Sequence, residues 1–210
     1  MEEVFDIPHA YPLLLAYVLK GHPEVDKAEL ERYKQEVWTM DRTDDIYCHI
    51  LEEAGIDPKS ELQVFDERLK RKRTVTARDA VKTVVQMWIY LDSKKKRFAE
   101  REIEMYQAVA AFYETHFPTI AQAVYDWPFE LKDYIDSSFT ITKKPIKTIC
   151  HSFQQVERRV SIHLCSLLKV PYQPLFDAIF VRKRDCKSLQ ERIDFIAEMR
   201  KVLEENNLHE

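Results

Sequence analysis

Three pairs of cysteine and histidine lie close enough in the sequence to suggest a metal site: Cys48 with His49, Cys150 with His151, and His163 with Cys165. On a helix, adjacent side chains diverge by about 100° and side chains two apart by about 200°, so no pair has a natural chelate spacing. With only two glycines, the chain has no G-x-x-x-x-G-K phosphate loop and no G-x-G-x-x-G fingerprint. We therefore expect neither a metal nor a cofactor.

A second candidate for chemistry is the pair Arg158 and His163, separated by four residues. The spacing is similar to the R-x(4–6)-H motif of the helical HEPN ribonucleases. This resemblance implies an all-α, dimeric, metal-independent endoribonuclease with Arg158 and His163 as its catalytic residues. The alternative makes His163 a core or interface histidine, because it lies on an apolar helix face. On that helix Arg159 shares the face of His163, whereas Arg158 lies about 140° around the axis.

Charge is distributed very unevenly along the chain. Residues 1–66 contain 16 acidic and 6 basic side chains, whereas residues 68–101 contain 12 basic and 3 acidic ones, although the whole chain has a formal net charge of −4. Such asymmetry indicates partners or self-pairing and carries no information about the fold.

Two basic clusters in this segment are predicted to contact an anionic partner, either an acidic protein surface or nucleic acid. Their members are Arg68, Lys70, Arg71, Lys72, Arg73, Lys94, Lys95, Lys96 and Arg97. The alternative is a solvated face, or one paired with the acidic first third of this chain or of a second copy. The dipole of an expected helix explains part of the first cluster, but not Lys94–Arg97.

Composition predicts the fold class. The chain of 210 residues is 45% apolar, which is enough for a core, and its two glycines are far below the usual ~7%. Tight hairpins depend on glycine, so we predict an all-α fold: an irregular multi-helix bundle of about eight to ten helices with one long central helix or helix pair.

Helix caps and apolar periodicity predict the individual helices. They cover residues 12–20, 23–37, 43–54, 58–69, 119–127, 129–135, 146–167, 175–181 and 188–203. Thr43 is expected to cap the helix over 43–54, and Gly55 is expected to stop it. Another helix starts at Thr76, whose side chain is expected to cap toward Asp79. This helix either continues to Phe117 or breaks near Asp92 and Ser93.

The helix over 146–167 has the strongest pattern, an apolar seam at alternating spacings of three and four. The seam is a possible oligomer interface formed by Ile149, Phe153, Val156, Val160, His163 and Leu167, although burial in the chain's own core fits equally well. We predict an N-terminal helical region over 1–135, a loop or linker over 136–145, and a C-terminal helical region over 146–210 in the same domain.

The leading prediction of function is a non-enzymatic interaction protein that assembles through amphipathic helices and contacts an anionic partner through its basic segment. A protein partner or self-association is expected, and nucleic acid is possible. No membrane partner is expected, because the apolar run Leu13–Leu19 is too short to span a bilayer. The four cysteines show no disulfide framework, which indicates a cytoplasmic location, or a nuclear one because of Lys70–Arg73.

Overall fold

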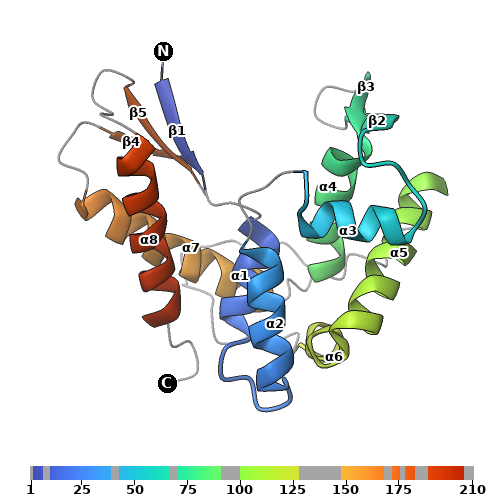
Figure 1. Cartoon of the computed structure of the whole chain (residues 1–210), viewed down its shortest axis with the longest axis horizontal. Coiled ribbons are helices and arrows are strands. Elements are labelled where there is room, and N and C mark those ends of the chain that lie inside the picture. The colour runs from blue at the N-terminus through green and yellow to red at the C-terminus, as the bar shows by residue number, and fades with distance from the viewer. Residues whose placement is uncertain are drawn as a thin grey trace, which may run out of the picture. The chain divides into compact units, whose positions relative to one another are not determined.

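The computed structural model describes residues 2–6, 10–38, 43–66, 71–90, 100–127, 148–167, 172–175, 178–182 and 189–205 (Figure 1). This part of the chain is mostly helical, which confirms the coarse prediction. Its contacts divide the chain into two compact units, residues 1–22 with 129–210, and residues 23–128. The predicted linker over 136–145 and the predicted helix over 129–135 lie outside the described residues.

The unit of residues 23–128 is built from five helices and one hairpin in its described part. In chain order they are α2 (Lys27–Val37), α3 (Ile46–Glu53), β2 (Glu61–Asp66), β3 (Arg71–Thr76), α4 (Ala77–Ile89), α5 (Glu100–His116) and α6 (Pro118–Asp126). Helix α4 packs against α5, α3 packs against both of them, and α2 contacts α6.

Capping residues set where these helices begin and end. Asp26 caps α2 by accepting from the Glu29 N–H at 2.8 Å, so α2 begins later than the predicted Pro23. Helix α3 is capped by Asp45 rather than by the predicted Thr43. Gly55 terminates α3 as predicted, and its φ of +70° permits bonds from Gly55 N to Glu52 O and from Ile56 N to Leu51 O.

Aromatic side chains form the core of this unit. The Trp88 ring of α4 stacks on Tyr113 of α5, with centroids 4.1 Å apart. The hydroxyls of Tyr113 and Tyr33 of α2 share a hydrogen bond of 2.9 Å, and both side chains are fully buried. Trp88 Nε1 donates to the Tyr125 hydroxyl at 3.3 Å, which connects α6 to the same cluster.

The β2–β3 hairpin replaces a predicted helix over 58–69, and that prediction was wrong. Asp57 and Pro58 start a turn, in which the Asp57 side chain accepts from the Lys59 N–H at 2.9 Å. The chain then extends, and β2 pairs antiparallel with β3 from Glu61 opposite Thr76 to Asp66 opposite Arg71. Pairing with a strand further along the chain therefore decided the outcome, a signal that local periodicity does not contain.

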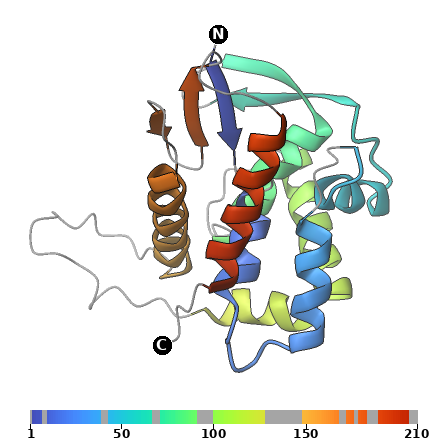
Figure 2. The same ribbon diagram turned by 60° about the vertical axis from the view of Figure 1, so that its left-hand side comes forward.

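The other unit combines a small sheet with three helices. Its described elements are β1 (Glu2–Asp6), α1 (Ala10–Val18), α7 (Thr148–Leu167), β4 (Tyr172–Leu175), β5 (Ala178–Arg182) and α8 (Leu189–Glu205). The sheet is antiparallel in the order β1-β5-β4. Helix α7 packs against both α1 and α8, and Figure 2 shows α7 and α8 in orange and red.

Two further predictions need correction. The helix expected over 175–181 is wrong, because β5 occupies 178–182; its run Ile179-Phe180-Val181 is rich in strand-forming residues. The class is also not strictly all-α, since both units contain a small antiparallel sheet.

The helix that starts after Thr76 ends at Ile89 with Tyr90 as its C-cap, so it does not run unbroken to Phe117. Among the described helices, none has the length and apolar character that a membrane span needs.

Candidate functional site

Strand β3 presents three consecutive cations of the predicted basic clusters. Arg71, Lys72 and Arg73 are all exposed. The remaining members, Arg68, Lys70, Lys94, Lys95, Lys96 and Arg97, lie outside the described residues. The described part of the predicted surface is therefore one exposed strand rather than a helix end.

The pleat of β3 divides its cations between two faces. Side chains alternate along a strand, so Arg71 and Arg73 lie on one face and Lys72 on the other. Residues paired across the hairpin share a face, which places Val64 beside Arg73. On the face of Lys72, Gln63 donates through its side-chain nitrogen to the Thr74 hydroxyl at 2.6 Å.

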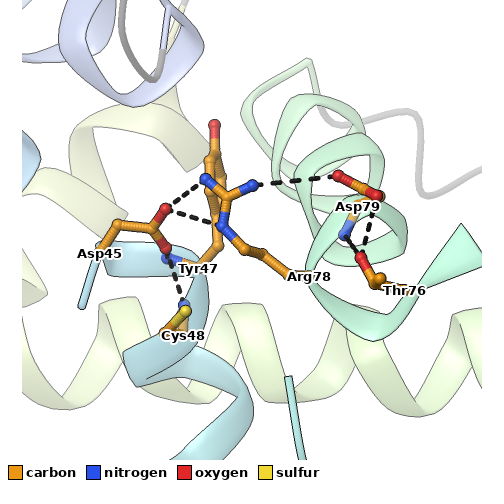
Figure 3. Close-up of polar contacts among 6 residues, drawn as sticks. All are labelled: Asp45, Tyr47, Cys48, Thr76, Arg78 and Asp79. Atoms are coloured by element: carbon orange, nitrogen blue, oxygen red, sulfur yellow. Dashed lines mark hydrogen bonds and ion pairs between the residues drawn. The ribbon is translucent and has the colours of Figure 1, made fainter. Parts of the chain in front are cut away.

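A fourth cation of the basic segment, Arg78, has a different environment (Figure 3). Arg78 lies in the first turn of α4, and its Nε donates to Asp45 Oδ2 at 2.9 Å, while its Nη2 bonds to the same oxygen. The other oxygen, Asp45 Oδ1, accepts from the N–H groups of Tyr47 and Cys48 at 3.0 Å each. Asp45 thus caps α3 and holds α4 with a single carboxylate that has no exposed surface.

Neighbouring groups complete this environment. Burial alone would lower the pKa of Arg78, but its hydrogen bond and charge interaction with Asp45 outweigh burial and raise it. The guanidinium carbon lies 5.5 Å from the centroid of the Tyr47 ring. Thr76 accepts from the Asp79 N–H at 3.1 Å, which confirms the predicted cap and fixes the start of α4 where Arg78 is located.

These contacts separate the basic segment into two kinds of cation. Asp45 belongs to the acidic first third of the chain, so Arg78 is neutralised within the protein. Arg71, Lys72 and Arg73 are exposed to solvent, where they can meet an external anion. These three cations of β3 therefore have the exposure that an interaction surface requires.

The pair Arg158 and His163 lies on α7. His163 Nε2 is 3.2 Å from Glu198 Oε2 of α8, so its partner is a carboxylate of the same unit. Arg158 is exposed. Because His163 is five positions further along the helix, the two side chains are about 140° apart around its axis. The helix therefore does not aim the two side chains at one point within one chain.

The predicted seam of α7 is covered within its own unit where the structure describes it. Phe153, Val156 and Val160 expose at most 2% of their surface. Tyr11 of α1 stacks on Phe153 with ring centroids 6.4 Å apart. The side chains of Ile149 and Leu167 lie outside the described set. Burial of the three central residues supports the core interpretation of the seam.

No group of three or more potential metal ligands occurs among the described His, Cys, Asp and Glu residues. Cys48 is buried beside Asp45, and this burial raises the pKa of its thiol. A raised pKa disfavours the thiolate, so Cys48 is suited to packing rather than to nucleophilic chemistry.

Sequence reasoning missed the pairing of Asp45 with Arg78. The two residues are 33 positions apart, and nothing in their local patterns links them. The only available signal was the N-cap pattern at Asp45, where an acidic residue precedes the apolar start Ile46-Tyr47. Comparisons with protein-family models, curated proteins and solved structures find no match to this chain.

Proposed function

We propose that this chain is a non-enzymatic interaction protein that contacts an anionic partner, an acidic protein surface or nucleic acid, through its basic segment. The observation that carries the proposal is the exposure of three consecutive cations, Arg71, Lys72 and Arg73, on β3. Amphipathic helices would supply the scaffold, and β3 would supply the contact.

The physical argument concerns local rather than total charge. Lys72 projects from the opposite face of β3, whereas Arg71 and Arg73 share a face and are about 6.6 Å apart along the strand, which is less than the screening length of about 8 Å at physiological ionic strength. Their fields therefore add, although the whole chain has a net charge of −4. Such a contact weakens as salt increases.

Replacement of all three cations tests the proposal. Arg71→Ala, Lys72→Ala and Arg73→Ala would be combined in one variant, and its binding to labelled polyglutamate, single-stranded RNA and duplex DNA measured by fluorescence anisotropy. We expect the parent protein to bind at least one of these probes at low ionic strength. The variant should bind it at least tenfold more weakly and with a smaller salt dependence.

The matched control removes the same charge from elsewhere in the unit. Lys27, Lys59 and Lys82 are exposed, so their combined replacement by alanine changes the net charge equally without altering β3. Equal losses in both triple variants would contradict the proposal, since total charge would then explain binding. Absence of binding by the parent protein at low salt would also contradict it.

A further inference from the structure

Strand β3 lies at the edge of its sheet. The sheet has two strands in the order β2-β3, so in the described part of the chain β3 has a strand neighbour on one side only. Its residues Arg71–Thr74 are exposed. An exposed edge of this kind presents backbone N–H and C=O groups that can pair with another extended chain.

The register identifies which groups point outward. The Ala77 N–H donates to Ser60 O at 2.8 Å, and this pair continues the register that joins Glu61 to Thr76. Hydrogen-bonded and non-hydrogen-bonded pairs alternate in an antiparallel ladder. The backbone groups of Arg71 and Arg73 therefore point toward β2, and those of Lys72 and Thr74 point away from it.

The outward groups favour a polypeptide over nucleic acid. Lys72 and Thr74 each offer a donor and an acceptor, and another strand satisfies both kinds of group. A phosphate accepts hydrogen bonds but offers no donor to the carbonyl groups. The backbone of β3 therefore complements a strand better than it complements a phosphate chain.

Charge determines which strand fits best. In an added antiparallel strand, two residues would form hydrogen-bonded pairs with Lys72 and Thr74. Their neighbours in that strand would lie opposite Arg71 and Arg73, in non-hydrogen-bonded pairs, where side chains are closest. Arg71 and Arg73 share one face, so acidic residues at alternate positions would meet both of them.

We propose that the outer edge of β3 binds an extended acidic segment of a partner protein, which adds to the hairpin as an antiparallel third strand. This inference rests on the proposed function and specifies the partner. It also predicts the partner's pattern, with acidic side chains at every second position.

Backbone methylation separates strand addition from simple charge attraction. The probe is a labelled peptide of alternating glutamate and threonine, and its binding to the full chain would be measured by anisotropy. Methylation of the threonine nitrogens should weaken binding at least tenfold, because these nitrogens donate to β3. Methylation of the glutamate nitrogens should leave binding within about twofold, and both peptides keep the same charge.

A substitution in β3 gives an independent readout. The Thr74 N–H points away from β2, so Thr74→Pro removes an outward donor without removing a backbone hydrogen bond of the hairpin, although it also removes the exposed side-chain bond from Gln63. This variant should bind the peptide at least tenfold more weakly and keep the circular dichroism spectrum of the parent protein. Lys82→Ala, an exposed change on α4, is the control and should bind normally.

The outcomes distinguish this inference from the proposed function. Equal binding of both methylated peptides would overturn strand addition, and so would binding of RNA or DNA in place of the peptide. Neither result would contradict the proposal that β3 contacts an anionic partner. Concentration-dependent self-association that Thr74→Pro abolishes would assign the edge to a second copy and likewise overturn it. Absence of binding to every probe would overturn both proposals.

Discussion

The fully buried carboxylate of Asp45 and the partly exposed guanidinium of Arg78 form an ion pair that joins the start of α3 to the start of α4. One oxygen of Asp45 accepts from two backbone N–H groups and the other from Arg78 (Figure 3). Breaking such a pair leaves a buried charge without compensation, which costs more than the intact pair contributes. We therefore expect the pair to contribute to the stability of the unit of residues 23–128.

Asp45→Asn should lower the free energy of unfolding by about 2–4 kcal/mol, because asparagine still caps α3 but leaves Arg78 with only the longer contact from its Nη1 to Asp79 Oδ1, at 3.9 Å. Asp45→Ala should cost about 1 kcal/mol more, since the cap is also lost. Urea unfolding followed by tryptophan fluorescence measures both variants. Trp38, Trp88 and Trp127 all belong to this unit, so the signal reports its unfolding. A double-mutant cycle with Arg78→Met isolates the coupling, and additive effects would contradict the prediction.

His49 should make the stability of this unit depend on pH. Its ring contacts Glu36 of α2 through Nδ1 and Asp44 through Nε2, the latter at 2.8 Å. Burial opposes the charged form, but the hydrogen bonds to Asp44 and Glu36 outweigh burial and raise the pKa of His49 above its usual 6.5. A raised pKa in the folded state means that the stabilisation is complete below pH 6.5 and is lost as pH rises through the folded pKa.

The stability difference between the parent protein and His49→Gln should therefore shrink between about pH 5.5 and pH 8.5. We expect a change of at most about 1 kcal/mol, because the side chains of this site are partly exposed to solvent. Urea unfolding at both pH values measures it, and an NMR titration of the His49 ring gives the folded pKa directly. A difference that grows toward pH 8.5 would contradict the assignment.

The Tyr33 and Tyr113 hydroxyls form a pair whose removal should be less than additive. Both side chains are buried, and burial raises the pKa of each phenol well above its usual value. Tyr113→Phe should cost about 1–2 kcal/mol, because it leaves the buried Tyr33 hydroxyl without this bond. The double replacement by phenylalanine should cost clearly less than the sum of the two single ones in urea unfolding. Strict additivity would show that each hydroxyl is satisfied independently.

The contrast between α3 and the hairpin shows what local sequence can predict. The end of α3 followed from Gly55 alone, because a left-handed residue stops a helix wherever it occurs. Asp57 and Pro58 start a turn that can precede either a helix or a hairpin. The spacing of Leu62 and Phe65 fits a helix, and the spacing of Leu62 and Val64 fits a strand equally well. Pairing with β3 resolved this ambiguity, and it depends on residues beyond any local window.

The candidate site was likewise predicted in part from local sequence, while the rest depended on contacts between distant residues. Consecutive cations identified Arg71–Arg73 as a basic cluster, but the sequence placed it at a helix end, where a dipole would have explained part of its charge. Because the cluster lies on a strand, no helix dipole accounts for its charge. The strand register instead specifies which side chains share a face and which backbone groups point away from β2. The neutralisation of Arg78 by Asp45 could not be read from the sequence, because it depends on how α3 and α4 pack.

Thr76 provides a test of how the hairpin is joined to α4. Its hydroxyl accepts from the Asp79 N–H at 3.1 Å and donates to Asp79 Oδ2 at 2.9 Å, and Thr76 itself belongs to the terminal pair of the hairpin, opposite Glu61. Thr76→Ala should lower the free energy of unfolding by about 1 kcal/mol, the usual cost of losing a threonine N-cap. Thr74→Ala is the matched control, because it removes the same atoms from the same strand but only an exposed bond with Gln63. We expect the control to cost less than about 0.5 kcal/mol. Equal costs would show that strand propensity, rather than the cap, makes Thr76 important.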